Sequence, residues 1–271
     1  MTNRISIRGA LACTVLTLGM SGAAQAEIVF SDAYGTRPHG QDIWDTLPTT
    51  ASAGVGTYGR VLDWPYSGKI DAFTPLGTVL KFDTSSGAAT QMVYVPYSHT
   101  FGAGRVEITL RAAHGTNQPG FNNFAIGFGD PVAGIFTDHI LVQSDRIELN
   151  LPGTGTTTSV AFGSTPGTFY EFVLGYDPAL AGRMGEQPWS LSINGAMIDI
   201  PVEATTVYTA LDGFAAVAFG GRHSNGLTTR FISDFALSIL PGTSVPTPGS
   251  AALVGAGLVA GFALRRRRRA G

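Results

Sequence analysis

Apolar and polar side chains alternate along much of this chain, and this period of two constrains its fold most. Residues 105–111 have the sequence RVEITLR. The apolar residues Val106, Ile108 and Leu110 occupy every second position, and charged residues and a threonine occupy the positions between them. Residues 146–151, RIELNL, repeat the pattern. Because successive side chains of a β-strand point to opposite faces, the alternation predicts strands with one face in a core. Further strands are expected at 79–83, 92–95, 124–129, 169–176, 215–219 and 230–240.

The connections between these runs favour antiparallel pairing. Glycine, proline, asparagine and aspartate interrupt the runs every eight to twelve residues, and no long amphipathic helical pattern is found. Between two runs in residues 189–198, WSLSINGAMI, stands the pair Asn194-Gly195. This pair predicts a two-residue hairpin, because a type I′ turn needs positive φ at both central positions. The chain is therefore predicted to be all-β, with two antiparallel sheets packed as a sandwich.

The N-terminus has the pattern of a secretory signal. Two arginines precede an apolar stretch at residues 9–20, and small residues follow up to Ala24-Gln25-Ala26. Residues 1–26 are therefore predicted to be a signal peptide, cut after Ala26, with the export machinery and signal peptidase as partners. The only cysteine, Cys13, lies inside this segment. We expect the exported chain to have neither a disulfide nor a cysteine metal site.

The C-terminus combines an apolar run with a basic end. Residues 250–264 carry no charge, and the uncharged stretch extends back to Val245. A helix of about twenty such residues is long enough to span a bilayer. Clustered arginines are retained on the cytoplasmic side, which predicts a transmembrane segment at 250–264 and a cytoplasmic tail at 265–271. The alternative is a buried C-terminal helix with a solvated basic end. The arginines are Arg265, Arg266, Arg267, Arg268 and Arg269.

The linker at 241–249 carries a further motif, made of Val245, Pro246, Thr247, Pro248 and Gly249. With the span and the arginines behind it, this motif resembles the PEP-CTERM sorting signal of exosortase-processed bacterial surface proteins. Thr247 stands where that family normally has a glutamate. The resemblance implies retention in the inner membrane, cleavage by an exosortase-type protease near the Pro-Thr-Pro motif, and delivery to the cell surface or extracellular matrix. It implies no enzymatic activity.

Between the targeting segments, residues 27–240 are long enough for one β-sandwich domain. Ten basic and nineteen acidic side chains give this region a net charge of −9. That balance argues against nucleic acid as a partner, since binding to nucleic acid depends on lysine and arginine. The order FYEFVLGYD at 169–177, WSLSING at 189–195 and RFISDFALSIL at 230–240 resembles the concanavalin A-like and laminin-G-like jelly rolls of extracellular proteins. The resemblance implies a jelly roll and favours carbohydrate or matrix binding, although a fold alone does not define a function.

No pattern of catalytic or metal-binding residues stands out, so we expect neither an enzyme nor a cofactor. Glu107 and Glu148 alternate with arginines, and we interpret them as members of a cross-strand charge ladder rather than as the paired carboxylates of a glycoside hydrolase, which is the lesser alternative. Oxygen ligands for Ca²⁺ could come from Asn122, Asn123, Asp130 and Asp138, but turn formation explains these residues better. The histidines lack metal-ligand spacing and are expected in solvated loops or at strand ends; they are His39, His99, His114, His139 and His223.

Sugar recognition is the remaining candidate, because aromatic faces stack on sugar rings while polar groups bind hydroxyls. One candidate cluster consists of Trp44, Tyr58, Asp63, Trp64 and Tyr66. A second contains His223 and Asn225 in the polar loop at 222–226. In the alternative interpretation the tryptophans anchor the core and the loop is only a turn. Two functions follow: a surface protein that binds polysaccharide noncatalytically, or a structural surface protein without a small ligand.

Overall fold

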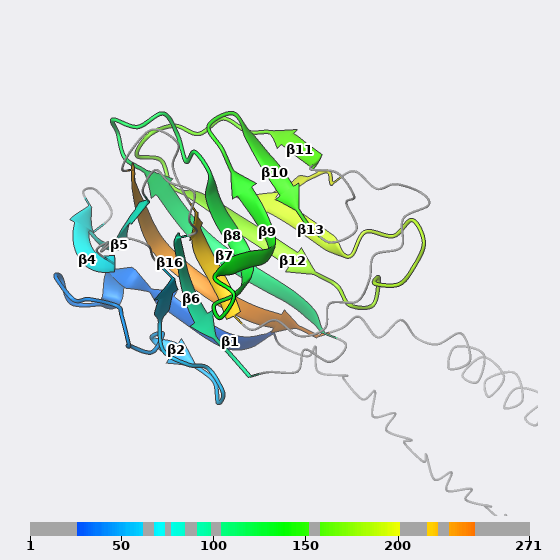
Figure 1. Ribbon diagram of the computed structural model, residues 1–271, viewed down its shortest axis with the longest axis horizontal. Coiled ribbons are helices and arrows are strands. Elements are labelled where there is room, and N and C mark those ends of the chain that lie inside the picture. The colour runs from blue at the N-terminus through cyan, green and yellow to red at the C-terminus, as the bar shows by residue number, and fades with distance from the viewer. Residues whose placement is uncertain are drawn as a thin grey trace, which may run out of the picture.

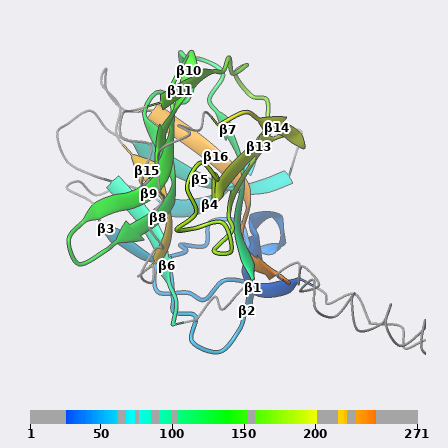
Figure 2. The same cartoon turned by 90° about the vertical axis from the view of Figure 1, so that its right-hand side faces the viewer.

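The computed structural model describes residues 26–61, 68–73, 77–84, 91–98, 104–151, 158–200, 216–221 and 228–241. In this part of the chain nearly every element is a strand, and the strands form two layers that face each other (Figure 1, Figure 2). All the strand pairs are antiparallel. The prediction of an all-β, two-sheet antiparallel sandwich is therefore confirmed.

The first sheet is built around its longest strand, β16 (Thr228–Leu240). Along one side of β16 runs β7 (Arg105–His114), and the other side is shared by β1 (Glu27–Ala33) and β5 (Gly77–Thr84). The sheet order is β14-β13-β12-β7-β16-β1-β2, with β4 pairing to β5. The remaining strands are β2 (Thr50–Ala51), β4 (Gly68–Phe73), β12 (Tyr170–Tyr176), β13 (Trp189–Ile193) and β14 (Ala196–Ile198). A short 3-10 helix, η1 (Tyr34–Thr36), follows β1.

The second sheet has the order β11-β10-β9-β8-β15-β6-β3. At its centre β15 (Ala216–Gly221) lies between β6 (Gln91–Pro96) and β8 (Phe124–Asp130). The other strands are β3 (Gly59–Val61), β9 (Ile135–Val142), β10 (Arg146–Asn150) and β11 (Thr158–Ala161).

Aromatic side chains from both sheets fill the space between them. Phe235 of β16 packs edge-on against Phe219 of β15, with ring centroids 5.0 Å apart. Phe219 in turn packs against Phe82 of β5 at 5.6 Å and lies 6.4 Å from Phe124 of β8. All four rings are fully buried. Since each close aromatic pair contributes about 0.5–1.5 kcal/mol beyond its buried area, these contacts join the two layers into one core.

The strands expected from the alternation overlap observed strands, and the hairpin is confirmed. Asn194 and Gly195 have φ values of 50° and 78° and connect β13 to β14. The pattern does not predict six of the observed strands, which are β1, β2, β3, β4, β9 and β11. Of these, β1 and β9 take part in irregular pairings. The register shifts between Ile28 and Phe30 in β1, and between Gly127 and Gly129 in β8, opposite β9. Such bulges interrupt the period of two.

The expected cross-strand charge ladder is wrong for the two glutamates. Glu107 pairs with Arg105 at 2.9 Å, and Glu148 with Arg146 at 3.0 Å. In each pair the partners lie two residues apart on the same strand, where side chains share one face. The cross-strand neighbours of Glu107 are Gly175 and Ser238, which carry no charge.

The targeting predictions fall outside the described residues. These are the signal sequence with Ala24, the motif at 245–249, the apolar run at 250–264 and the arginines at 265–269. Among the described residues, no helix has the length and apolar character needed to cross a membrane.

Candidate functional site

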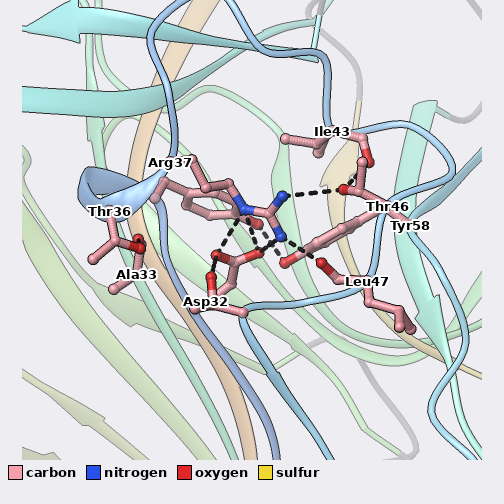
Figure 3. A network of polar contacts seen from close by, with 10 residues as sticks. Asp32, Ala33, Thr36, Arg37, Ile43, Thr46, Leu47 and Tyr58 are labelled. Atoms are coloured by element: carbon pink, nitrogen blue, oxygen red, sulfur yellow. Dashed lines mark hydrogen bonds and ion pairs between the residues drawn. The ribbon is translucent and has the colours of Figure 1, made fainter.

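A buried ion pair organises the irregular segment that follows β1 (Figure 3). Asp32, at 1% exposure, accepts hydrogen bonds from Nε of Arg37 at 3.0 Å to both carboxylate oxygens, and one from the Thr49 hydroxyl at 2.7 Å. Nη1 of the guanidinium donates to Thr46 Oγ1 at 3.1 Å, and Nη2 donates both to Asp32 and to the carbonyl of Leu47. Because charge-assisted bonds of this kind are strong and directional, the segment is fixed against the first sheet.

Two tyrosines complete this network beneath the guanidinium. The hydroxyl of Tyr34 donates to that of Tyr58 at 2.8 Å, and Arg37 lies 5.8 Å from the centre of the Tyr58 ring. Both rings are fully buried. Burial is the main cause that raises the pKa of each phenol well above 10, and the nearby Asp32 carboxylate adds to the rise. Tyr58 is therefore a neutral core residue, and its ring does not reach a surface where a sugar would stack.

Trp44 lies at the surface of the same segment. Its ring is partly exposed and packs with its inner part against the core. The guanidinium of Arg60, an exposed residue of β3, lies 4.9 Å from the ring centre. The backbone N–H of the next residue, Asp45, donates to the carbonyl of Tyr58 at 3.0 Å. We call Trp44 and Arg60 the Trp44 patch: an aromatic ring with a cation over it.

The other predicted sugar-binding residues lie outside the described residues. These are Asp63, Trp64 and Tyr66 of the first cluster, and His223 and Asn225 of the second. The third tryptophan, Trp189, is 3% exposed and packs on Tyr176 at 4.9 Å. It is a core anchor, as the alternative interpretation of the tryptophans proposes.

A second polar cluster, which the sequence did not suggest, lies between the sheets at the N-terminal end of β16. Arg230 and His114 are directly paired neighbours on β16 and β7, and both are completely buried. The ring of His114 lies 5.2 Å from that of Phe121. The guanidinium of Arg230 lies 5.8 Å from Phe121 and 5.9 Å from Phe124. Two basic side chains therefore occupy an aromatic environment.

The hydrogen bonds of His114 define its tautomer. Nδ1 lies 3.2 Å from the carbonyl oxygen of Gly115, and Nε2 lies 3.0 Å from Oγ of Ser164. Because a carbonyl only accepts, Nδ1 carries the proton and Nε2 accepts from the serine hydroxyl. Burial lowers the pKa of His114, and the nearby charge of Arg230 lowers it further. The imidazole is therefore neutral at neutral pH. His114 does lie at a strand end, as expected, but it is buried rather than solvated.

The residues considered for Ca²⁺ serve other purposes. Asp130 Oδ1 accepts from the backbone N–H groups of Val132 and Ala133 at 2.8 and 3.0 Å, which is the turn-forming role. Asn122 and Asn123 have φ values of 42° and 60°, a conformation that asparagine tolerates well. Asp138 is 8% exposed, on β9. In the described part of the chain, no three His, Cys, Asp or Glu side chains are grouped as metal ligands.

Comparison with known proteins identifies similar folds only. No family model matches the chain, and no curated protein matches it. A solved protein of unknown function from Shewanella oneidensis MR-1 is 11% identical over 88% of this chain and 98% of its own, with a TM-score of 0.50. At this identity the likeness shows the fold alone, a two-sheet sandwich that matches nearly the whole of that protein.

Two other solved structures are more distant. A botulinum neurotoxin type C structure, whose title describes cell entry through interaction with two ganglioside molecules, is 11% identical over 79% of this chain, with a TM-score of 0.45. An alginate lyase mutant in complex with an alginate trisaccharide is 12% identical over 67% of this chain and 87% of its own, with a TM-score of 0.42. The chain spans about half the length of the botulinum neurotoxin structures that it matches, 42–50%.

Proposed function

We propose that this chain is an exported protein of the cell surface or extracellular matrix whose jelly-roll sandwich binds polysaccharide noncatalytically. The observation that carries the proposal is the Trp44 patch. A partly exposed indole beside an exposed guanidinium offers an apolar face for a sugar ring and donors for its oxygens. The Arg37–Asp32 pair holds the loop below, which reduces the entropy lost when a ligand binds.

Glycan binding by the full-length chain, purified in detergent, tests this function. We expect retention of bacterial exopolysaccharides, and roughly a two- to tenfold loss of affinity in Trp44→Ala, since stacking on an aromatic ring contributes about 0.5–1.5 kcal/mol. Arg60→Ala should also weaken binding, whereas Arg183→Ala, at an exposed arginine paired with Glu186, is the matched control and should not. Absence of binding to every glycan would favour the structural protein without a small ligand. Unchanged binding in folded Trp44→Ala would place binding elsewhere on the molecule.

We further propose that the C-terminus is a sorting signal of the PEP-CTERM type, read by an exosortase-type protease. Two features of the sequence support this proposal: the order of motif, apolar run and arginines, and the signal-like N-terminus. The expected product at the cell surface lacks residues 250–264, and mass spectrometry of surface protein detects this. Replacing Arg265–Arg269 with serine should release uncut precursor, because five arginines strongly resist crossing a bilayer. A surface form that retains the peptide around Phe262 would identify a permanent anchor instead.

A further inference from the structure

The guanidinium of Arg230 is completely buried but only half satisfied. Its Nη1 donates to Oε1 of Gln118 at 3.1 Å and to the carbonyl of its neighbour Thr229 at 3.3 Å. Among the residues that the structure describes, its Nε and Nη2 are both buried and have no hydrogen-bond partner. Buried donors of a charged group that remain unpaired are strongly unfavourable. Such a defect therefore points to a missing acceptor.

The described neighbours of Arg230 do not supply this acceptor. Phe121 and Phe124 offer ring faces to the cation, which stabilise its charge but do not accept its N–H groups in line. His114 uses its single acceptor nitrogen for Ser164. Burial lowers the pKa of Arg230 to about 9, and the charge of Asp83 partly opposes this shift. The guanidinium is therefore positively charged at neutral pH.

The positions of the two unpaired donors indicate what would fit. Nε and Nη2 lie on the same edge of the planar guanidinium, and their N–H bonds are parallel. Two parallel donors match the two oxygens of a carboxylate, which binds arginine bidentately at this edge. A spherical anion such as chloride cannot accept from both donors along both N–H directions.

We propose that the Nε–Nη2 edge of Arg230 forms an anion site that takes a planar carboxylate, next to the rings of Phe121 and Phe124. The carboxylate can belong to a free small acid or to a uronic acid. The site does not depend on the Trp44 patch, so either proposal can fail without the other.

Thermal unfolding of the full-length chain at pH 7.5 tests the site. We expect sodium formate to raise Tm in a saturable way, by roughly 3–5 °C for each tenfold increase above Kd. Sodium chloride at the same ionic strength, and the neutral isostere formamide, should produce no comparable rise. Equal rises with chloride or formamide would overturn the proposal without any variant. Glucuronate with glucose as its control distinguishes the two sources: a rise with formate alone indicates a free small acid, and a rise with glucuronate indicates an acidic sugar.

Substitution at Arg230 gives a second test. Arg230→Lys keeps the charge but lacks the two parallel donors, so the formate response should weaken at least tenfold. Arg111→Lys is the matched control, since Arg111 lies on the adjacent strand β7 and is partly exposed. A folded Arg230→Lys with the full formate response would overturn the proposal. If that variant does not fold, the comparison of formate, chloride and formamide on the native chain still tests the proposal.

Discussion

At the scale of single residues, the carboxyl group of Asp138 makes stability depend on pH. Burial raises its pKa from 3.8 to about 6, and a hydrogen bond with the Thr137 side chain opposes part of this rise. Because the folded pKa exceeds the unfolded one, protonation favours the folded state. This stabilisation is complete below about pH 4 and is lost as the pH rises through about 6.

Asp138→Asn should therefore raise the free energy of unfolding at pH 7.5 by about 1–3 kcal/mol, and should have no such effect at pH 3.5. Denaturant titrations at the two pH values measure the difference. Asp145→Asn is the control, since the Asp145 side chain is 69% exposed. A gain for Asp138→Asn that is equal at both pH values would contradict the assigned cause.

The Arg37–Asp32 pair is also a single-residue determinant of stability. The two side chains are only 9% and 0% exposed. Removing the cation leaves a buried carboxylate without its partner, so Arg37→Ala should lower the free energy of unfolding by about 3–5 kcal/mol. Arg183→Ala, which breaks an exposed pair with Glu186, should cost less than about 1 kcal/mol. Similar losses of unfolding free energy in the two variants would show that water reaches the Asp32 carboxylate once Arg37 is removed.

At the scale of elements, close approach of strands at the centre of the second sheet depends on glycine. A Cβ at Gly220 of β15, where φ is 144°, would lie 2.1 Å from the carbonyl oxygen of Gln91 on β6. Gly220→Ala should therefore cost about 3 kcal/mol or more. Gly195→Ala should cost only about 1–2 kcal/mol, because Gly195 has positive φ but nothing within 4 Å of its Cβ position. Midpoints of urea unfolding rank the two variants, and the reverse order would refute this account.

Elements were predictable where the alternation is regular and unpredictable where it is not. Val106, Ile108 and Leu110 occupy even-numbered positions of β7 and mark its inward face. His114 also occupies an even-numbered position and therefore points inward. Arg230 lies two positions before Ile232 on β16, so the two side chains share the inward face. A sequence therefore indicates which face a residue occupies, but not that these two side chains meet beside Phe121. The burial of Tyr58 depends on Tyr34 and Arg37, which approach it only in the folded chain.

At the scale of the whole molecule, stability should not depend on redox state or on metal ions. The only cysteine of the chain is Cys13, within the predicted signal peptide. We expect the same Tm with and without a reductant, and with and without a chelator. Differential scanning calorimetry measures both comparisons. A large decrease with the chelator alone would restore the Ca²⁺ interpretation of Asp130 and Asp138.

The pairing of β1 with β16 joins the first described strand to the last, with Glu27 opposite Ile239. Roughly two hundred residues separate the two partners, so β1 leaves the ribosome long before its neighbour exists. At about 5–20 residues per second, this interval lasts about 10–40 s. During that time one side of β1 has no native partner, and the first sheet cannot close. The first sheet therefore cannot be completed before its final strand is available.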